Sequence, residues 1–370
     1  MKQKTVVIAP LNWGLGHATR TMPIIDALLA QGARVILASD GAALSLLQSE
    51  YPHLEIYELP AYNIRYPFSS MVLSIGVQMP KILRGCLGEY FWLKKFAKQH
   101  KIDVVISDNR FGFFHPKIHS IFMTHQVNLL IHNSFLQKIA NAVNHFFIKK
   151  FDALWIPDFE NEPNLAGQLS HGIMPIKRGD KHWSVQYVGS LSRFNHILKK
   201  KSSVFFEEKY TALVVLSGPE PQRTILEEKI VAQFKEIALQ FPSAKVVLVR
   251  GLKDAPPIDA GKLTVFDFLT ADTLFELIMS SEVVVCRSGY SSVMDLAALG
   301  KRAILIPTPG QTEQEYLAQK LHRAGIFLCQ KQSDLDLFEA FEQLKNYSGF
   351  GKMQPTNERL SELITELLKN

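Results

Sequence analysis

A strand–helix–strand–helix pattern between residues 282 and 325 constrains the fold of this chain more than any other stretch. The successive elements are expected at 283–285, 291–299, 303–306 and from about 313 onward. Gly300 stops the first helix and Pro307 ends the second strand. Such a unit is typical of a doubly wound parallel α/β sheet, in which loops and helix N-termini lie along one edge.

Polar residues gather at the turns of this unit. Those where a helix N-terminus and free backbone N–H groups can hold an anion are Ser288, Gly289, Ser291 and Ser292. Asp295 lies one helical turn further on, and Glu313 with Gln314 opens the next helix. Phosphate-binding backbone beside hydroxyl-binding carboxylate and amide groups is what a nucleotide-sugar site requires.

Composition limits the classes of partner. The chain has 370 residues, which favours two domains, and 47% of them are hydrophobic. The net charge of +6 suits nucleotide phosphates or an anionic membrane surface. The longest Lys/Arg run is the three residues 199–201, so nucleic-acid binding is not favoured. Cys86, Cys286 and Cys329 lack metal-type spacing, and we expect reduced thiols and no metal site.

No apolar run has the length that a membrane-spanning helix needs, about 18 residues. The apolar run 6–11 is too short for a signal sequence and predicts a first strand instead. We therefore expect a cytoplasmic protein, in peripheral contact with the inner face of the membrane at most.

The N-terminal half also alternates strands and helices. Strands are expected at 5–9, 34–38, 54–59, 104–107, 121–124, 153–157 and 187–189. Between the first two, a loop with Gly14 and Gly16 precedes a helix over 21–31. The glycines let the backbone approach a ligand closely, although the G-x-G-x-x-G dinucleotide fingerprint is absent.

His17 stands directly after this glycine pair. An imidazole with an ordinary pKa near 6.5 can accept a proton from a hydroxyl at neutral pH. We interpret His17 as a catalytic base; the alternative is that it caps the helix or binds a loop carbonyl. Arg20 can bind a phosphate or orient a carboxylate, and a plain surface position is the alternative.

The segment 61–96 combines aromatic and aliphatic residues with basic ones, and Glu89 is its only acid. This composition is typical of a segment that lies on a membrane surface or receives a lipid-linked substrate. The alternative is a set of helices packed on the sheet with basic outer faces.

A polar, basic stretch at 190–203 predicts a linker, after which the strand–helix pattern restarts. Ser217-Gly218 forms a second anion-binding turn there, without the Gly-Lys-Ser/Thr of a P-loop. We therefore predict an N-terminal domain over 1–200 and a C-terminal domain over 201–355. The last helix, within 356–370, is expected to pack back on the N-terminal domain.

Several motifs together resemble glycosyltransferase family 28. They are Cys286-Arg287-Ser288-Gly289, Asp295, Pro307, Gln311-Thr312-Glu313-Gln314 and Leu317-Ala318, with the loop Gly14 to Arg20 and Ser217-Gly218. The resemblance covers the C-terminal half well and the N-terminal half mainly in its first thirty residues. It implies a GT-B fold, with two Rossmann-like doubly wound domains facing across a cleft, and metal-independent, inverting transfer of a hexose or N-acetylhexosamine from a UDP-sugar.

The resemblance also implies residue roles. Asp295 would bind the ribose hydroxyls, Glu313 and Gln314 the sugar, and His17 would act as base or orienting group. The whole donor-binding set is Gly14, Gly16, Ser217, Gly218, Arg287, Ser288, Gly289, Ser291, Ser292, Asp295, Glu313 and Gln314. The acceptor, a small molecule or a lipid-linked one, would meet the N-terminal domain at Arg20, Asp108, Asn109 and Arg110. No cofactor is implied beyond the UDP-sugar co-substrate.

Three other functions remain open at this point. A nucleotide-sugar hydrolase of the same fold, with water as acceptor, carries a similar G-x-G-H-x-x-R loop. A UDP-sugar epimerase is another candidate. A protein that binds nucleotide-sugars without catalysis is the third.

Overall fold

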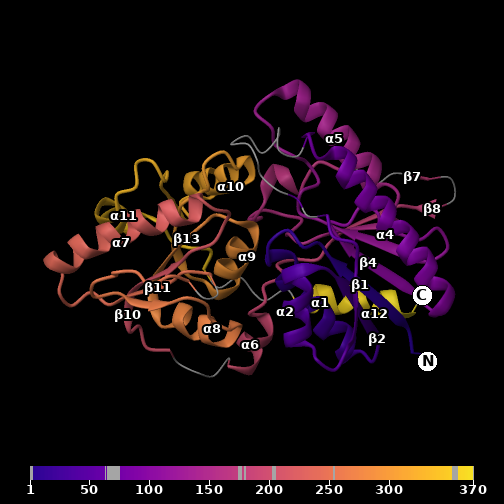
Figure 1. Ribbon diagram of the computed structural model, residues 1–370, viewed down its shortest axis with the longest axis horizontal. Coiled ribbons are helices and arrows are strands. Elements are labelled where there is room, and N and C mark those ends of the chain that lie inside the picture. Colours follow the sequence, from indigo (N-terminus) through magenta and orange to yellow (C-terminus); the bar gives the residue numbers. More distant parts are fainter. Residues whose placement is uncertain are drawn as a thin grey trace. The chain divides into compact units, whose positions relative to one another are not determined.

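The structure is a computed structural model of the chain, and it describes residues 3–62, 64, 76–173, 177–178, 181–201, 206–252, 255–351 and 357–369. The chain divides into two compact units (Figure 1). Unit 1 comprises Met1–Ser192 and Pro355–Asn370, and unit 2 comprises Arg193–Gln354. The sequence had placed these boundaries after residues 200 and 355. Each unit is described by itself.

Unit 1 contains a seven-stranded parallel sheet in the order β3-β2-β1-β4-β5-β6-β9. Its strands are β1 (Thr5–Pro10), β2 (Arg34–Ser39), β3 (Glu55–Glu58), β4 (Val104–Asp108), β5 (His119–Met123), β6 (Ala153–Ile156) and β9 (Ser184–Tyr187). Its helices are α1 (Gly16–Ala30), α2 (Gly41–Glu50), α4 (Met79–Gln99), α5 (Ser134–Ile148) and α12 (Asn357–Lys369). A short 3-10 turn, Gly167–Leu169, and a small antiparallel pair, β7 (Lys177–Arg178) with β8 (Lys181–His182), complete it.

The core of unit 1 lies between the sheet and its helices. Val7, Ile36 and Val105 from three central strands pack with Leu93 and Phe96 of α4. The middle residues of these strands are apolar because helices cover both faces of a parallel sheet. At the C-terminus, α12 packs against α1, where Gln31 Nε2 donates a hydrogen bond to the carbonyl of Ser361 at 2.9 Å.

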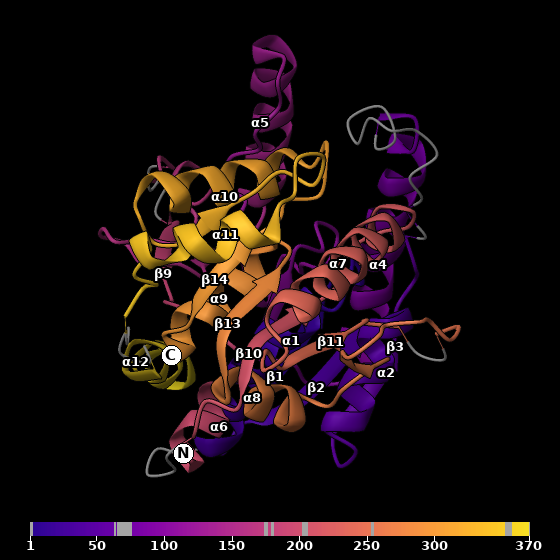
Figure 2. The same cartoon turned by 90° about the vertical axis from the view of Figure 1, so that its left-hand side faces the viewer.

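Unit 2 contains a six-stranded parallel sheet in the order β12-β11-β10-β13-β14-β15. Its strands are β10 (Tyr210–Val215), β11 (Val246–Val249), β12 (Thr264–Phe266), β13 (Ser281–Cys286), β14 (Arg302–Leu305) and β15 (Leu328–Cys329). Its helices are α6 (Asn195–Lys200), α7 (Gln222–Gln240), α8 (Ala271–Met279), α9 (Tyr290–Leu299), α10 (Thr312–Arg323) and α11 (Leu337–Gln343), with a 3-10 turn at Leu344–Asn346. Figure 2 shows α7, α10 and α11 around the strands of this sheet. The two doubly wound α/β units that the sequence predicted are confirmed.

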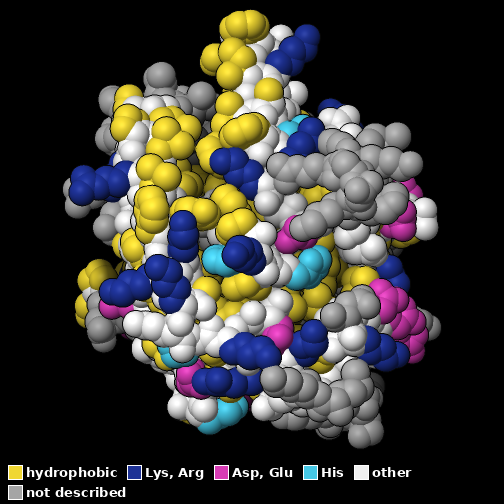
Figure 3. All heavy atoms as spheres, turned by 90° about the vertical axis from the view of Figure 1, so that its right-hand side faces the viewer, with side chains coloured by type: hydrophobic (Ala, Val, Ile, Leu, Met, Phe, Trp, Pro, Cys, Tyr) yellow, Lys and Arg dark blue, Asp and Glu magenta, His cyan; other side chains and the backbone are white. Residues whose placement is uncertain are grey.

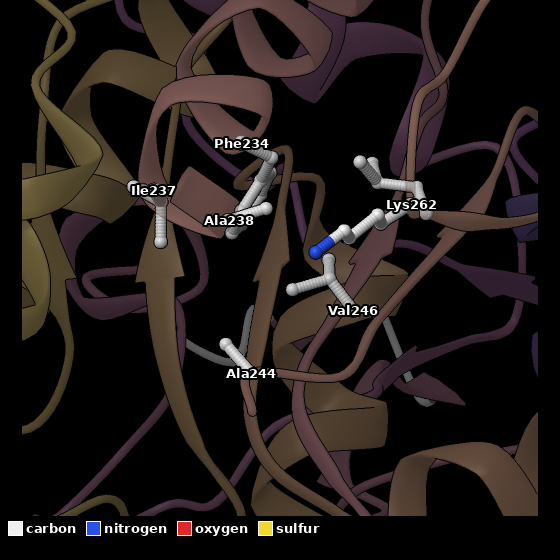
Figure 4. A pocket seen from close by; sticks show the side chains of 7 residues that line it. Phe234, Ile237, Ala238, Ala244, Val246 and Lys262 are labelled. Atoms are coloured by element: carbon white, nitrogen blue, oxygen red, sulfur yellow. The ribbon is translucent and has the colours of Figure 1, made fainter. Parts of the chain in front are cut away.

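A cavity of about 10 Å³ lies between α7 and β11 of unit 2 (Figure 4). It is lined by Phe234, Ile237, Ala238, Ala244, Val246, Lys262 and Leu263. Val246 begins β11 and Leu263 precedes β12, so the cavity lies toward the amino ends of the strands. Ligands of open α/β sheets bind at the opposite edge, and this void is an ordinary packing feature.

Two elements differ from the sequence expectation. Helix α1 begins at Gly16 rather than at residue 21, so His17 lies in its first turn. The polar residues 17–21 concealed this turn because they break the apolar periodicity. The stretch 190–203, predicted as a linker, carries the short helix α6, in which Ile197 is buried.

Candidate active site

Each sheet has one point where the chain reverses the direction in which strands are added. In unit 1 it lies between β1 and β4, and in unit 2 between β10 and β13. At such a point the loops that leave the carboxyl ends of the two strands diverge and leave room for a ligand. The loops at 11–15 and after Asp108 belong to the first, and the loops at 216–221 and 287–289 belong to the second.

His17 and Asp108 meet at the switch point of unit 1. The imidazole Nδ1 of His17 lies 3.0 Å from Oδ1 of Asp108, the last residue of β4. The His17 side chain is 14% exposed and Asp108 is fully buried. The structure records no partner for His17 Nε2 among the residues it describes. This is the arrangement of a general base oriented by a carboxylate.

Arg20 completes this cluster from one turn further along α1. Its Nε donates to Asp108 Oδ2 at 2.7 Å, and its Nη2 donates to Asp108 Oδ1. Its Nη1 contacts Nδ1 of His125, a residue that follows β5, at 2.9 Å. The sequence had assigned Arg20 and Asp108 to the acceptor; the structure shows them bound to each other and to the imidazoles.

The charges and the burial of the cluster shift the pKa values of His17 and Asp108, for different reasons. Burial lowers the pKa of His17 below 6.5, Asp108 opposes that shift, and Arg20 reinforces it. Burial alone would raise the pKa of Asp108, yet Arg20 and then His17 hold it at about 2. At neutral pH the dyad is therefore an ionised carboxylate with a neutral imidazole.

Arg110 has a structural position. It is fully buried, and its guanidinium donates to the carbonyl of Pro10 at 2.9 Å, to Glu89 at 2.7 Å and to Asp40. All of its charge is directed inward, so we assign it to the framework rather than to an acceptor. Asn109, the residue before it, is partly exposed and takes a left-handed conformation with φ of 58°.

The glycine loop of each unit contains a glycine with a positive φ. In unit 1, Gly14 has φ of 76° and an open space where a Cβ would stand, and Gly16 begins α1. In unit 2, Ser217 and Gly218 are exposed, and Gly218 has φ of 105°. Positive φ values favour glycine at both turns.

The N-terminus of α9 lies beside the second loop. Gly289 precedes this helix with no side-chain cap and open space above its Cα. Ser291 and Ser292, in the first turn, are partly exposed. The first-turn N–H groups of a helix have no partner within the helix, which makes this end suited to an anion. Ser288 is fully buried, and its hydroxyl donates to the carbonyl of Gln314 at 2.8 Å.

Arg287 lies beneath these loops and is 1% exposed. Its terminal nitrogens donate to the carbonyls of Ile306 and Pro307 and to Gln332 Oε1, and burial lowers its pKa to about 10. Its Nε, like the Thr308 hydroxyl, has no hydrogen-bond partner within the described chain. A Cβ placed on Gly218 would lie 3.9 Å from that Nε and 3.5 Å from Thr308 Oγ1.

Asp295 and the start of α10 supply the remaining polar groups. Asp295 is nearly buried, and its Oδ2 accepts a hydrogen bond from Arg193 Nε at 3.1 Å. The side chain of Gln314 bonds to the loop that precedes α10. Its Oε1 accepts a hydrogen bond from the Thr308 N–H at 2.9 Å, and its Nε2 donates one to Gln311 Oε1 at 2.6 Å. Glu313, in the first turn of α10, is partly exposed.

Sequence reasoning missed Arg193, Thr308 and His125. Arg193 stands in the polar stretch that predicted only a linker, and no motif marks the other two. Within the described ranges no group of three or more His, Cys, Asp or Glu side chains is placed to hold a metal ion. In the same part of the chain no helix combines the length and apolarity that crossing a membrane requires.

Solved structures with the same architecture define the class of fold. Over 99% of this chain, a UDP-GlcNAc 2-epimerase of Neisseria meningitidis bound to UDP-GlcNAc superimposes with a TM-score of 0.64 at 15% identity, covering 100% of that chain. MurG of Acinetobacter baumannii superimposes with a TM-score of 0.55 at 13% identity, covering 99% of each chain. The fold is a GT-B fold, as the sequence predicted.

The sequence itself places the chain more narrowly. Residues 211–366 match the glycosyltransferase family 28 C-terminal domain. A UDP-N-acetylglucosamine–N-acetylmuramyl-(pentapeptide) pyrophosphoryl-undecaprenol N-acetylglucosamine transferase of Sulfurihydrogenibium sp. is 24% identical over 47% of this chain and 52% of its own length. The chain thus spans about half the length of this curated relative. The match over residues 211–366 confirms the predicted resemblance of the chain to glycosyltransferase family 28.

Proposed function

We propose that this protein is a glycosyltransferase that moves a hexose or N-acetylhexosamine from a UDP-sugar to a lipid-linked acceptor. The observation that carries the proposal is the family 28 domain, whose match spans both loops of the unit 2 switch point. The relative named above uses a UDP-N-acetylglucosamine donor and an undecaprenol-linked acceptor. The His17–Asp108 dyad in unit 1 supplies the proton acceptor that such a transfer needs.

Unit 2 binds the donor in this proposal. The diphosphate lies against the N-terminus of α9 and the loop at Gly218, where one of its oxygens receives hydrogen bonds from Arg287 Nε and Thr308 Oγ1. Those two unpartnered donors beside a glycine support the assignment. Preorganised donors of this kind stabilise the charge that develops on a leaving diphosphate, so the proposed reaction uses no metal. Losing one such donor typically costs about 3 kcal/mol of transition-state stabilisation.

Polar side chains of unit 2 bind the ribose and the sugar of the donor in this proposal. Asp295, held by Arg193, accepts hydrogen bonds from ribose hydroxyls. Glu313 contacts the sugar hydroxyls, while Gln314 shapes the turn that presents it, since both ends of its amide already have partners.

His17 is the base. Its Nε2 takes the proton of the acceptor hydroxyl as that oxygen attacks the anomeric carbon, and UDP leaves with the electron pair of the broken glycosidic bond. A single displacement of this kind inverts the anomeric centre. Asp108 holds the opposite ring nitrogen and stabilises the imidazolium that forms.

Helices α4 and α5 support a peripheral contact with an anionic membrane. Exposed large hydrophobic residues lie on or just before α4 (Val77, Leu83, Leu87, Phe91) and on α5 (Phe135, Leu136, Ile139, Val143, Phe146). Figure 3 shows hydrophobic side chains along both helices, with Lys and Arg beside them. The only acid of α4, Glu89, is fully buried, and α5 has none. Of the predicted segment 61–96, residues 63 and 65–75 lie outside the described residues.

The orientation of α5 is unusual for a helix on a globular protein. Its polar side chains face inward: Asn144 Nδ2 donates to the carbonyl of Val127 at 2.9 Å, and Asn141 exchanges hydrogen bonds with the backbone of Leu129. The exposed apolar side chains named above face outward, whereas Ile148 near the end of the helix is buried. A helix with an exposed apolar stripe and flanking lysines such as Lys138 and Lys150 suits the interface of a bilayer.

A titration of the full chain with UDP tests the donor proposal. We expect saturable binding that Asp295→Asn weakens by about tenfold or more, the scale of a hydrogen bond to a charged group. Asp272→Asn, in the first turn of α8, is the matched control and should leave UDP affinity unchanged. No detectable UDP binding by the wild type would contradict the proposal.

A further inference from the structure

Arg20 is the one residue that contacts every other member of the unit 1 cluster. It is 4% exposed, and its three nitrogens reach Asp108, His17 and His125, which stand on or after three different elements. The proposed function uses only the dyad. A buried arginine shared between two imidazoles and a carboxylate therefore needs its own explanation.

The guanidinium of Arg20 determines the hydrogen-bonding role of His125 Nδ1. A guanidinium has only donors, so the ring nitrogen that it faces must carry a lone pair. Arg20 Nη1 lies 2.9 Å from His125 Nδ1. Nδ1 of His125 is therefore the acceptor of this hydrogen bond.

His17 Nδ1 faces two groups with opposite demands. Asp108 Oδ1 and Arg20 Nη2 both lie 3.0 Å from it, and the carboxylate requires a proton there while the guanidinium requires a lone pair. Arg20 is already bound to both oxygens of Asp108, which keeps the carboxylate ionised and in one plane. Nδ1 of His17 therefore carries a proton that it donates in a hydrogen bond to the carboxylate, and Nε2 keeps the lone pair that a base needs.

We propose that Arg20 is a positioning residue that orients the His17–Asp108 dyad and keeps His17 unprotonated until the acceptor hydroxyl arrives. Burial and the positive guanidinium both oppose a second proton on His17, and Asp108, Arg20 and His125 are the titratable and charged groups that act on this imidazole. The inference rests on the proposed function for its catalytic meaning, but its effect on His17 does not depend on turnover.

The test is the titration of His17 in the full chain labelled with ¹⁵N-histidine, assigned with His17→Asn and His125→Asn. In the wild type we expect the Nδ1–H tautomer and a pKa below the ordinary value of 6.5. In Arg20→Met the pKa of His17 should rise, and the acid limb of kcat/KM should move to higher pH. kcat at pH 7 should fall about tenfold or more while UDP affinity stays unchanged.

Two further variants keep the test decisive. Arg20→Lys retains the charge without the bidentate geometry, so it should shift the tautomer balance of His17 and His125 even if Arg20→Met fails to fold. Arg34→Met, which removes an exposed arginine paired with Glu55, should leave both imidazoles unchanged. A His17 titration that is unchanged in the Arg20 variants overturns the inference. A shifted titration without turnover on any donor upholds it and counts against the proposed function alone.

Discussion

The two ring nitrogens of His17 have different tasks. Nδ1 contacts Asp108 within the cluster, whereas Nε2 is the atom that we propose accepts the proton, in a side chain that is 14% exposed. The flanking glycine loop leaves open space at Gly14, and the buried Arg20 and Asp108 prevent the ring from rotating freely. The sequence presents this residue only as a histidine after two glycines, and the structure adds the contact of its Nδ1 with Asp108.

Replacing His17 by alanine should cut turnover by about 10²-fold or more, because the proton acceptor is lost. UDP affinity should stay nearly intact, since unit 2 binds the nucleotide in this account. Initial rates and calorimetric UDP titration on the same preparation measure the two quantities. Unchanged turnover in His17→Ala would remove His17 from the mechanism.

The pH dependence should follow the lowered pKa of His17. The imidazole is active when neutral, and its pKa lies below 6.5, so kcat/KM for the acceptor should stay level from pH 7.5 down past 6.5 and fall only at lower pH. The same shift makes the folded state less stable as pH falls through this range, because the unfolded histidine takes up its proton first. An acid limb centred above pH 6.5 would disagree with the structure.

At the scale of the element, local chemical signals predicted the helices well. Gly300 ends α9 in the left-handed conformation, with φ of 63°, and Asp336 caps α11 by accepting a hydrogen bond from the Glu339 N–H. The last helix was predicted at 357–369 and begins and ends there. Sequence-adjacent residues determine these features, which explains the agreement.

The positions of charged side chains depended on distant contacts and were harder to predict. Arg287 matched a family motif, yet its guanidinium is buried among groups up to 65 residues away. Arg193 meets Asp295 across 102 residues. The sequence predicted which loops lie at the switch points of the two sheets but could not show which of their side chains point inward.

The loop at Gly218 gives an element-scale prediction. Gly218→Ala forces a side chain into a left-handed conformation beside Thr308 and Arg287, so both stability and UDP affinity should fall, the latter by about tenfold. Gly261→Ala is the matched control, because Gly261 has φ of 61° in the turn before β12. Both variants should lose roughly 1 kcal/mol of unfolding free energy, and only the first should lose affinity. Equal UDP affinity in the two variants would place the diphosphate elsewhere.

The exposed apolar face of α5 gives a second prediction at the scale of the element. Wild-type protein should co-sediment with vesicles that contain anionic lipid, less so as salt rises, and a Phe135→Asp/Phe146→Asp double variant should lose this binding. Leu239→Asp, at an 81% exposed position on α7 of unit 2, is the control and should bind vesicles as the wild type does. If the double variant also binds like the wild type, α5 is not the contact surface.

At the scale of the whole molecule, the account divides the work between two units of similar architecture. Unit 2 contains most of the region that matches the family 28 domain and the carboxylate that we propose binds ribose, whereas unit 1 contains the proposed base and the helices with exposed apolar and basic residues. The net charge of +6 is consistent with a phosphate-bearing donor and an anionic surface.

Release of UDP from a panel of UDP-sugars, with and without a polyprenyl-diphosphate-linked glycan, tests the central claim most directly. The account predicts release from UDP-N-acetylglucosamine or a related UDP-hexose only when the acceptor is present, together with a glycosylated lipid product. UDP release in water alone would indicate a hydrolase, and conversion of the donor to its epimer without UDP release would indicate an epimerase. UDP-sugar binding without turnover in the presence of the acceptor would contradict the claim that this protein is a transferase.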